Sequence, residues 1–212
     1  MAGEESWERQ TVEQQPTGFS LWGWWIVATA AGWGLAGGLI GAFVHSSGSP
    51  LQYSFLPLTA LGQWLILRRH FAQASWWIVA TTGGALVAGI AYTLILRLPV
   101  DQFGPATSGA RIGLSTIFDG LALAVAQWLV LRGNVPGTRW WIPADAGPLW
   151  FFAALELDRG TEAAELLETL NYLDQIALAA TSLGIVGAMV GMATGGVLMW
   201  LVQQPRMDEL NQ

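Results

Sequence analysis

The chain has 212 residues, of which 53% are hydrophobic and only 11% are charged, against roughly 25% charged residues in ordinary soluble domains. All nine basic residues are arginines and there is no cysteine, which excludes disulfides, thiol catalysis and thiolate metal sites. The formal net charge is −6, and this balance argues against nucleic acid as a partner because nucleic acid requires a basic face. The composition therefore predicts a membrane protein.

Membrane spans are expected wherever roughly 20 mostly apolar residues follow one another, because a helix of that length crosses a hydrocarbon core of about 30 Å. After a polar, acidic tail over residues 1–20, four stretches qualify: 21–44, 75–96, 112–131 and 176–202. Two shorter ones, 51–67 and 140–155, contain proline and polar residues. We predict six spans, with an interfacial or re-entrant segment as the alternative for 140–155. Residues 204–212 are expected to form a second polar tail.

Two strings recur along the chain and interleave. The sequence Trp-Trp-Ile-Val-Ala-Thr occupies residues 24–29 and again 76–81, with a weaker copy at 140–145. The sequence Gln-Trp-Leu-x-Leu-Arg occupies residues 63–68 and 127–132, with a worn copy at 199–204. Self-similarity of this kind predicts an all-α transmembrane domain over residues 21–203, built from three parallel two-helix repeats over about 21–68, 75–132 and 140–203.

The orientation follows from the arginines. With the N-terminus inside, the cytoplasmic segments carry six arginines and the outer loops three, which favours an N-in, C-in protein of the bacterial inner membrane. Most of the tryptophans then fall at the cytoplasmic ends of the spans. Because indole rings prefer the headgroup level, we expect an interfacial belt, with arginines as snorkelling anchors. The residues concerned are Trp24, Trp25, Trp64, Trp76, Trp77, Trp128, Trp140, Trp141 and Trp200, with Arg68 and Arg132.

Small residues recur at helical spacing in the first and last spans. Gly34 and Gly38 lie four residues apart in the first, and Gly187, Gly191 and Gly195 form one stripe in the last. This spacing lets helix backbones approach closely in lipid. We expect packing inside the bundle, with a dimer face on the last helix as the alternative.

An acidic amphipathic segment follows the fifth stretch. Leucines at positions 166, 167, 170 and 173 recur at helical spacing beside several glutamates, which predicts a short helix over about 161–174 on the outer surface. Its acidity favours the rim of the bundle or a partner protein over anionic lipid.

Polar groups within the spans are functional candidates, because stranding a charge in the membrane costs at least about 2.5–3.5 kcal/mol. Asp119 lies in the middle of the stretch 112–131, where it either lines a polar pathway for a proton or cation or forms an inter-helix hydrogen bond. Asp145 occupies the position of Thr29 and Thr81 in the repeat, which indicates a structural role. For Gln63 and Gln127, inter-helix hydrogen bonds are favoured over a polar ring at the inner mouth.

No cofactor, metal or catalytic site is predicted. The two histidines, His45 and His70, both lie at the ends of spans, whereas axial ligation of haem normally requires a histidine within the span. The sequence contains no Gly-rich phosphate loop, no zinc-binding His-Glu-x-x-His and no Gly-x-Ser-x-Gly elbow.

The repeated Gln-Trp-Leu-x-Leu-Arg and Trp-Trp-Ile-x-Ala strings resemble those of a group of uncharacterised polytopic membrane proteins of cyanobacteria and filamentous phototrophic bacteria. The likeness covers about residues 60–150 together with the first and last spans. It implies a multi-pass membrane fold and no particular activity.

These observations predict a non-enzymatic integral membrane protein that packs against other membrane subunits, in a homo-oligomer or a larger complex. One alternative is a small transporter or channel with Asp119 in a central polar pathway. Another is an accessory subunit of a respiratory or photosynthetic complex. Apart from membrane lipid, no partner is identified by the sequence.

Overall fold

The computed structural model describes residues 18–43, 56–71, 73–97, 107–133 and 137–203, and in these ranges it is helical with no strand. The predicted tail over residues 204–212, and residues 1–17 of the other tail, lie outside the described residues. The helices are α1 (Gly18–Phe43), α2 (Leu56–Leu67), α3 (Ser75–Leu96), α4 (Thr107–Leu131), α5 (Trp141–Thr169) and α6 (Tyr172–Val202), with a short 3-10 helix, η4 (Thr138–Trp140), before α5.

Four of these helices are long and apolar enough to cross a membrane, namely α1, α3, α4 and α6. They coincide with the four stretches that the sequence marks most strongly as spans. The intervening helix α2 is apolar but has only 12 residues, and α5 does not belong to this group of four. The described part of the chain is thus all-helical, and its four long apolar helices are typical of a membrane protein.

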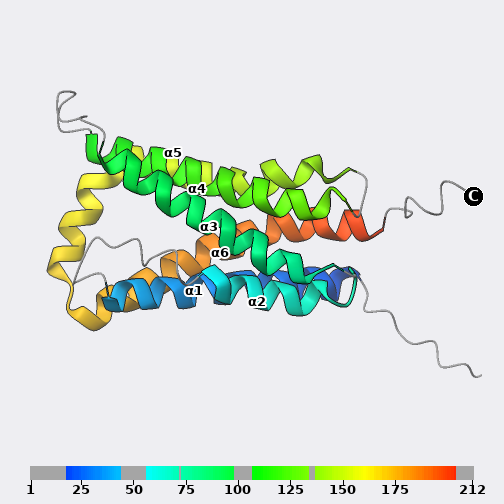
Figure 1. The fold of residues 1–212 in the computed structure, drawn as a ribbon. Helices are drawn as coiled ribbons and strands as arrows, with labels where there is room; N and C mark the ends of the chain where they lie inside the picture. Colours follow the sequence, from blue (N-terminus) through cyan, green and yellow to red (C-terminus); the bar gives the residue numbers. More distant parts are fainter. Residues whose placement is uncertain (1–17, 44–55, 72, 98–106, 134–136, 204–212) are drawn as a thin grey trace, which may run out of the picture.

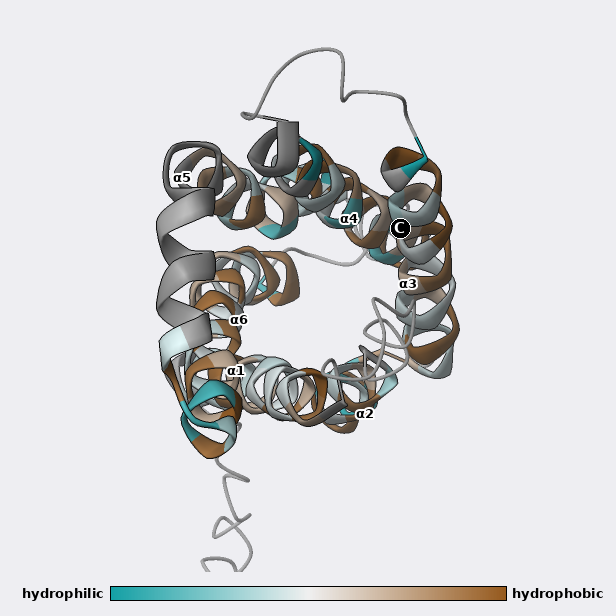
Figure 2. Cartoon of the chain, turned by 90° about the vertical axis from the view of Figure 1, so that its left-hand side faces the viewer, coloured by the Kyte–Doolittle hydropathy of each residue, from teal (hydrophilic) through white to brown (hydrophobic). Residues whose placement is uncertain are grey.

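The helices form a ring in chain order (Figure 2). Each makes its main contacts with the helix before it and the helix after it, and α6 closes the ring by packing against α1. Figure 1 shows that the start of α1, the end of α6 and the α2–α3 and α4–α5 turns all lie at the same end of the bundle. We call this the turn end.

The α1–α6 contact is built on glycines. A Cβ atom added to Gly187 would lie 2.6 Å from Cβ of Trp33, and one added to Gly191 would lie 3.0 Å from Cα of Ile26. Gly195, Gly34 and Gly38 lie on the same interface, the first against Trp22 and the other two against Ala180. Hydrogen bonds from Trp22 to the Met192 carbonyl (3.2 Å) and from Tyr172 to the Ala42 carbonyl (2.8 Å) join the two antiparallel helices near their opposite ends. The glycine stripe of α6 is therefore covered by α1 and is not a free dimer face.

The structure corrects the prediction for the segment after the fifth stretch. A short span over 140–155 followed by a separate helix over 161–174 was expected, but α5 runs without interruption from Trp141 to Thr169. The alanines, leucines and glutamates of residues 162–168 are strong helix formers, which favours continuation. Figure 1 shows the last turns of α5 bending across the end of the bundle opposite the turn end. Asn171 then caps α6, because its side chain accepts a hydrogen bond from the backbone N–H of Asp174 (3.0 Å).

Candidate functional site

Three tryptophans from three different helices meet inside the turn end. Trp25 of α1, Trp77 of α3 and Trp141 of α5 each have 0% of their surface exposed. Their rings pack edge to face, with centroid distances of 5.8 Å (Trp25–Trp77), 5.3 Å (Trp77–Trp141) and 6.0 Å (Trp25–Trp141). Edge-to-face packing is favourable because the positive edge of one ring meets the negative face of the next. We call these three residues the tryptophan trio.

Each indole of the trio donates its N–H to a polar side chain on an even-numbered helix. Trp77 donates to Oε1 of Gln63 on α2 (2.9 Å), and Trp141 donates to Oε1 of Gln127 on α4 (3.1 Å). Trp25 donates to Oγ1 of Thr194 on α6 (2.9 Å). The trio thereby ties all six helices together at this end, since three helices supply the rings and the other three supply the acceptors.

The amide nitrogens of both glutamines also donate hydrogen bonds, and they do so in the same way. Nε2 of Gln63 donates to Oγ1 of Thr29 on α1, and Nε2 of Gln127 donates to Oγ1 of Thr81 on α3, each over 3.1 Å. The Thr29 hydroxyl in turn donates to the backbone carbonyl of Trp25, one turn earlier (2.8 Å). Each glutamine is buried and bridges the helix on either side of its own. Both therefore form inter-helix hydrogen bonds.

The third copy of the motif departs from this pattern. Met199 stands where the other copies have glutamine, and Thr194 accepts the indole N–H instead. Asp145, in the position of Thr29 and Thr81, is buried with 6% of its surface exposed. Asp145 is therefore an interior residue of the ring, next in chain order to the buried Ala146.

One member of each Trp-Trp pair lies in the interior of the bundle, where it cannot belong to a belt on the outer surface. Trp24, Trp76 and Trp140 are more than half exposed, whereas Trp25, Trp77 and Trp141 are fully buried. The physical reason is helical geometry: adjacent residues point about 100° apart, so two neighbouring tryptophans do not face the lipid together. The threonine one turn after Trp25 and Trp77 is the sequence signal that marks the buried member.

Arg68 and Arg132 also have specific partners. Each guanidinium lies over the ring of a tryptophan one turn earlier in its helix, Arg68 at 5.1 Å from the centroid of Trp64 and Arg132 at 5.2 Å from that of Trp128. Such cation–π contacts fix the orientation of both groups. Trp64 and Trp128 are partly buried against the core that surrounds the trio, so they connect the arginines to it.

We expect the protein to fold without either glutamine bridge, with a moderate loss of stability that is the same for the two bridges. Gln63→Met and Gln127→Met each leave an indole N–H without its acceptor, but the third copy already carries methionine at this position. The free energy of unfolding should fall by about 1–2 kcal/mol in either variant. Reversible unfolding in mixed micelles would measure it. A loss from one glutamine but not from the other would contradict the equivalence of the two bridges.

Asp119 does not lie close to Gln63 or Gln127. Asp119 is half-buried in the middle of α4, with one carboxylate oxygen, Oδ1, buried. It lies eight residues before Gln127 on the same helix, which corresponds to about 12 Å along the axis. A polar pathway shared by these groups therefore lacks support in the arrangement of the side chains.

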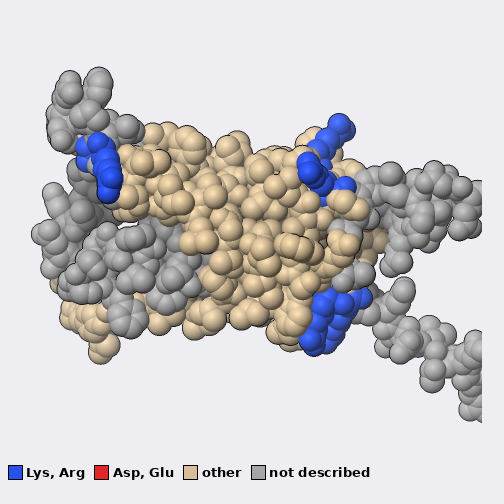
Figure 3. All heavy atoms as spheres, viewed as in Figure 1, with Lys and Arg blue, Asp and Glu red and all other residues tan. Residues whose placement is uncertain are grey.

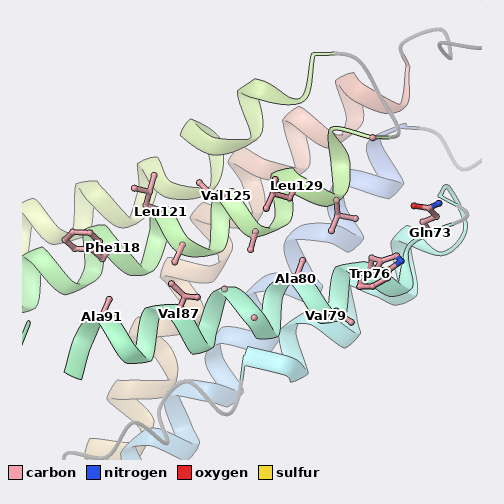
Figure 4. Close-up of a pocket in the computed structure, with 16 residues that line it drawn as sticks. Gln73, Trp76, Val79, Ala80, Val87, Ala91, Phe118, Leu121, Val125 and Leu129 are labelled. Carbon is pink, nitrogen blue, oxygen red and sulfur yellow. The ribbon is translucent and has the colours of Figure 1, made fainter. Parts of the chain in front are cut away.

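An apolar groove of about 810 Å³ opens outward between α3 and α4 (Figure 4). Trp76 and Gln73 lie at the turn end of the groove, and Ala91 and Phe118 lie at its other end. Small residues line its length, among them Ala80, Gly83, Gly84, Ala122 and Ala126. A Cβ atom added to Gly83 would meet nothing within 4 Å. The space next to Gly83 in the groove is therefore empty of other side chains.

A second groove, of about 510 Å³, lies between α1 and α2. Its lining residues occupy the same positions of the repeated strings: Trp24 corresponds to Trp76, Val27 to Val79, Ala28 to Ala80, Gly62 to Ala126, Leu65 to Leu129 and Ile66 to Val130. The two grooves differ at the turn end. Arg69 and His70 line the α1–α2 groove, whereas Gly133 takes the position of Arg69 in the α3–α4 groove.

Neither a metal cluster nor a known relative narrows the function. Within the described ranges, no three His, Asp or Glu side chains gather as metal ligands. Comparison with protein-family models, curated proteins and solved structures finds no match for this chain.

Proposed function

We propose that this chain is a non-enzymatic membrane protein of the bacterial inner membrane, which acts by packing against other membrane subunits as a structural or accessory component. The observation that carries this proposal is the α3–α4 groove, which faces outward, has a volume of about 810 Å³ and includes small residues along its apolar lining. In lipid, association between helices depends on close packing, and small residues permit it. The groove is suited to a transmembrane helix of a partner subunit.

The interior supports the same function. The buried amides of Gln63 and Gln127 are engaged by tryptophan and threonine side chains of neighbouring helices, so they stabilise the ring and leave the outer surface to interact. Figure 3 shows arginine side chains gathered at the two ends of the molecule with a broad uncharged surface between them. That surface suits contact with lipid and with other apolar helices.

The proposal includes a specific arrangement in the membrane: six spans in three parallel two-helix repeats, with both termini in the cytoplasm. It is supported by the identical bridges of Gln63 and Gln127, by the equivalent grooves and by the ring order of the helices. In this arrangement the turn end lies at the cytoplasmic face, where the excess of arginine is expected. In this arrangement the short helix α2 is the second helix of the first repeat, and the proline-containing α5 is the first helix of the third repeat.

The test is to purify the full chain from its native membrane in a gentle detergent and to determine subunit composition by intact-complex mass spectrometry. We expect defined partner subunits at fixed stoichiometry, and we expect Gly83→Leu to release them because the leucine side chain would project into the groove and block the close approach of a partner helix. Gly23→Leu is the matched control, since Gly23 also has open space around its Cβ position but lies on α1 outside both grooves.

A chain that purifies alone, or partners that survive Gly83→Leu as well as they survive Gly23→Leu, would contradict this assignment. The first outcome would direct attention to the transport alternative. Proton and cation flux into liposomes would then be compared between the unmodified chain and Asp119→Asn, which removes the charge and keeps the shape of the side chain.

A further inference from the structure

The two equivalent grooves differ in charge at the turn end. In the α1–α2 groove the apolar lining ends at Arg69 and His70, beside the exposed Trp24. In the α3–α4 groove the same end carries Gln73 and Gly133. The apolar lining of the α1–α2 groove thus ends at a cationic group, whereas the residues that line the α3–α4 groove include no charged side chain.

At neutral pH the positive charge at the end of the α1–α2 groove is carried by Arg69. Partial burial, and then the neighbouring charge of Arg69, lower the pKa of His70, which favours its neutral form. Arg68 is held over Trp64, whereas Arg69 is exposed and lines the groove. Arg69 is therefore the residue positioned to meet an anionic group at the groove's end.

We propose that the α1–α2 groove is a binding site for an anionic phospholipid, with one acyl chain along Val27, Ala31 and Leu65 and the phosphate against Arg69. The charge and polarity of the groove match such a lipid. The acyl chain would contact the apolar lining, and the anionic headgroup would contact the guanidinium of Arg69. Basic sites between membrane helices bind anionic headgroups at the cytoplasmic leaflet. A partner helix would match the lining but not the cation.

This site is separate from the α3–α4 groove of the proposed function, so either proposal can fail without the other. The experiment is native mass spectrometry of the full chain in detergent, titrated with phosphatidylglycerol or with phosphatidylcholine of the same acyl chains. We expect one phosphatidylglycerol to bind about fivefold more tightly than phosphatidylcholine, the preference that a single arginine near a headgroup supplies.

Two substitutions test the assignment in opposite directions. Arg69→Gly should abolish the preference for phosphatidylglycerol while leaving phosphatidylcholine binding unchanged. Gly133→Arg should create a second preferred site, because a Cβ atom at Gly133 meets nothing within 4 Å and the equivalent groove already lies beside it. Ala31→Leu, which narrows the first groove, should weaken the binding of both lipids there.

Arg139→Gly is the control for general surface charge. Arg139 lies at the same end of the bundle, over Trp140 at 5.8 Å, and lines neither groove. Equal affinity for the two lipids in the unmodified chain would overturn the proposal. So would a loss of preference in Arg139→Gly as large as that in Arg69→Gly, or a failure of Gly133→Arg to add a site.

Discussion

Replacing Trp77 by alanine is expected to destabilise the bundle by about 3–5 kcal/mol, the range for removing a buried aromatic side chain. Trp77 is fully buried, contacts both other members of the tryptophan trio and donates to Gln63. Its loss would open a cavity between α1, α3 and α5 and leave the amide oxygen of a buried glutamine without its donor. The measurement is the free energy of unfolding in mixed micelles.

The neighbouring Trp76 provides the control. Trp76→Ala removes the same side chain from the adjacent position of the same helix, but Trp76 is 58% exposed and lines the outer groove. We expect it to cost less than about 1 kcal/mol, as for substitutions away from the core. If Trp76→Ala and Trp77→Ala lowered the free energy of unfolding by similar amounts, burial of the tryptophan trio would not be a main source of stability at the turn end. The pairs Trp24/Trp25 and Trp140/Trp141 should repeat the contrast.

The second large effect is expected at the α1–α6 interface. In Gly187→Val the new Cβ would lie 2.6 Å from Cβ of Trp33 and 2.9 Å from the Thr29 carbonyl oxygen. The contact with the carbonyl involves backbone and cannot be relieved by a change of rotamer, so the two helices would have to separate. We expect a loss of about 3 kcal/mol, at the upper end of the range for overpacked cores. Thermal unfolding would measure this loss.

Gly196→Val separates this clash from helix propensity. Both glycines lie within α6, and a Cβ atom at Gly196 would meet nothing within 4 Å. The intrinsic cost of valine in a helix is therefore shared, and only Gly187→Val forces α1 away. If the two variants unfolded at the same temperature, the close approach of α1 and α6 would not be a source of stability.

Much of the architecture could be read from the sequence because it depends on local properties. The four stretches of high hydropathy became α1, α3, α4 and α6, since length and apolarity alone decide whether a helix matches a bilayer. The glycine spacing in the first and last of them indicated close packing, because four-residue spacing keeps small residues on one helical face. The repeated glutamine, likewise, indicated a buried amide that needs partners from other helices.

The partners themselves were decided by the tertiary structure. The threonine one turn after Trp25 distinguishes it locally from Trp24 but names no partner. Trp24 is 67% exposed and Trp25 fully buried because the rotation of α1 in the ring turns only Trp25 toward α3 and α5. The indole N–H of Trp25 finds Thr194, 169 residues away in the chain, and the glycine stripe of α6 finds α1 and not a second copy. The sequence by itself determined which segments would form long apolar helices and which glycines would allow helices to approach closely. Closure of the ring decided which side chains would be buried and which would meet, because contacts between distant helices depend on their relative rotation and depth.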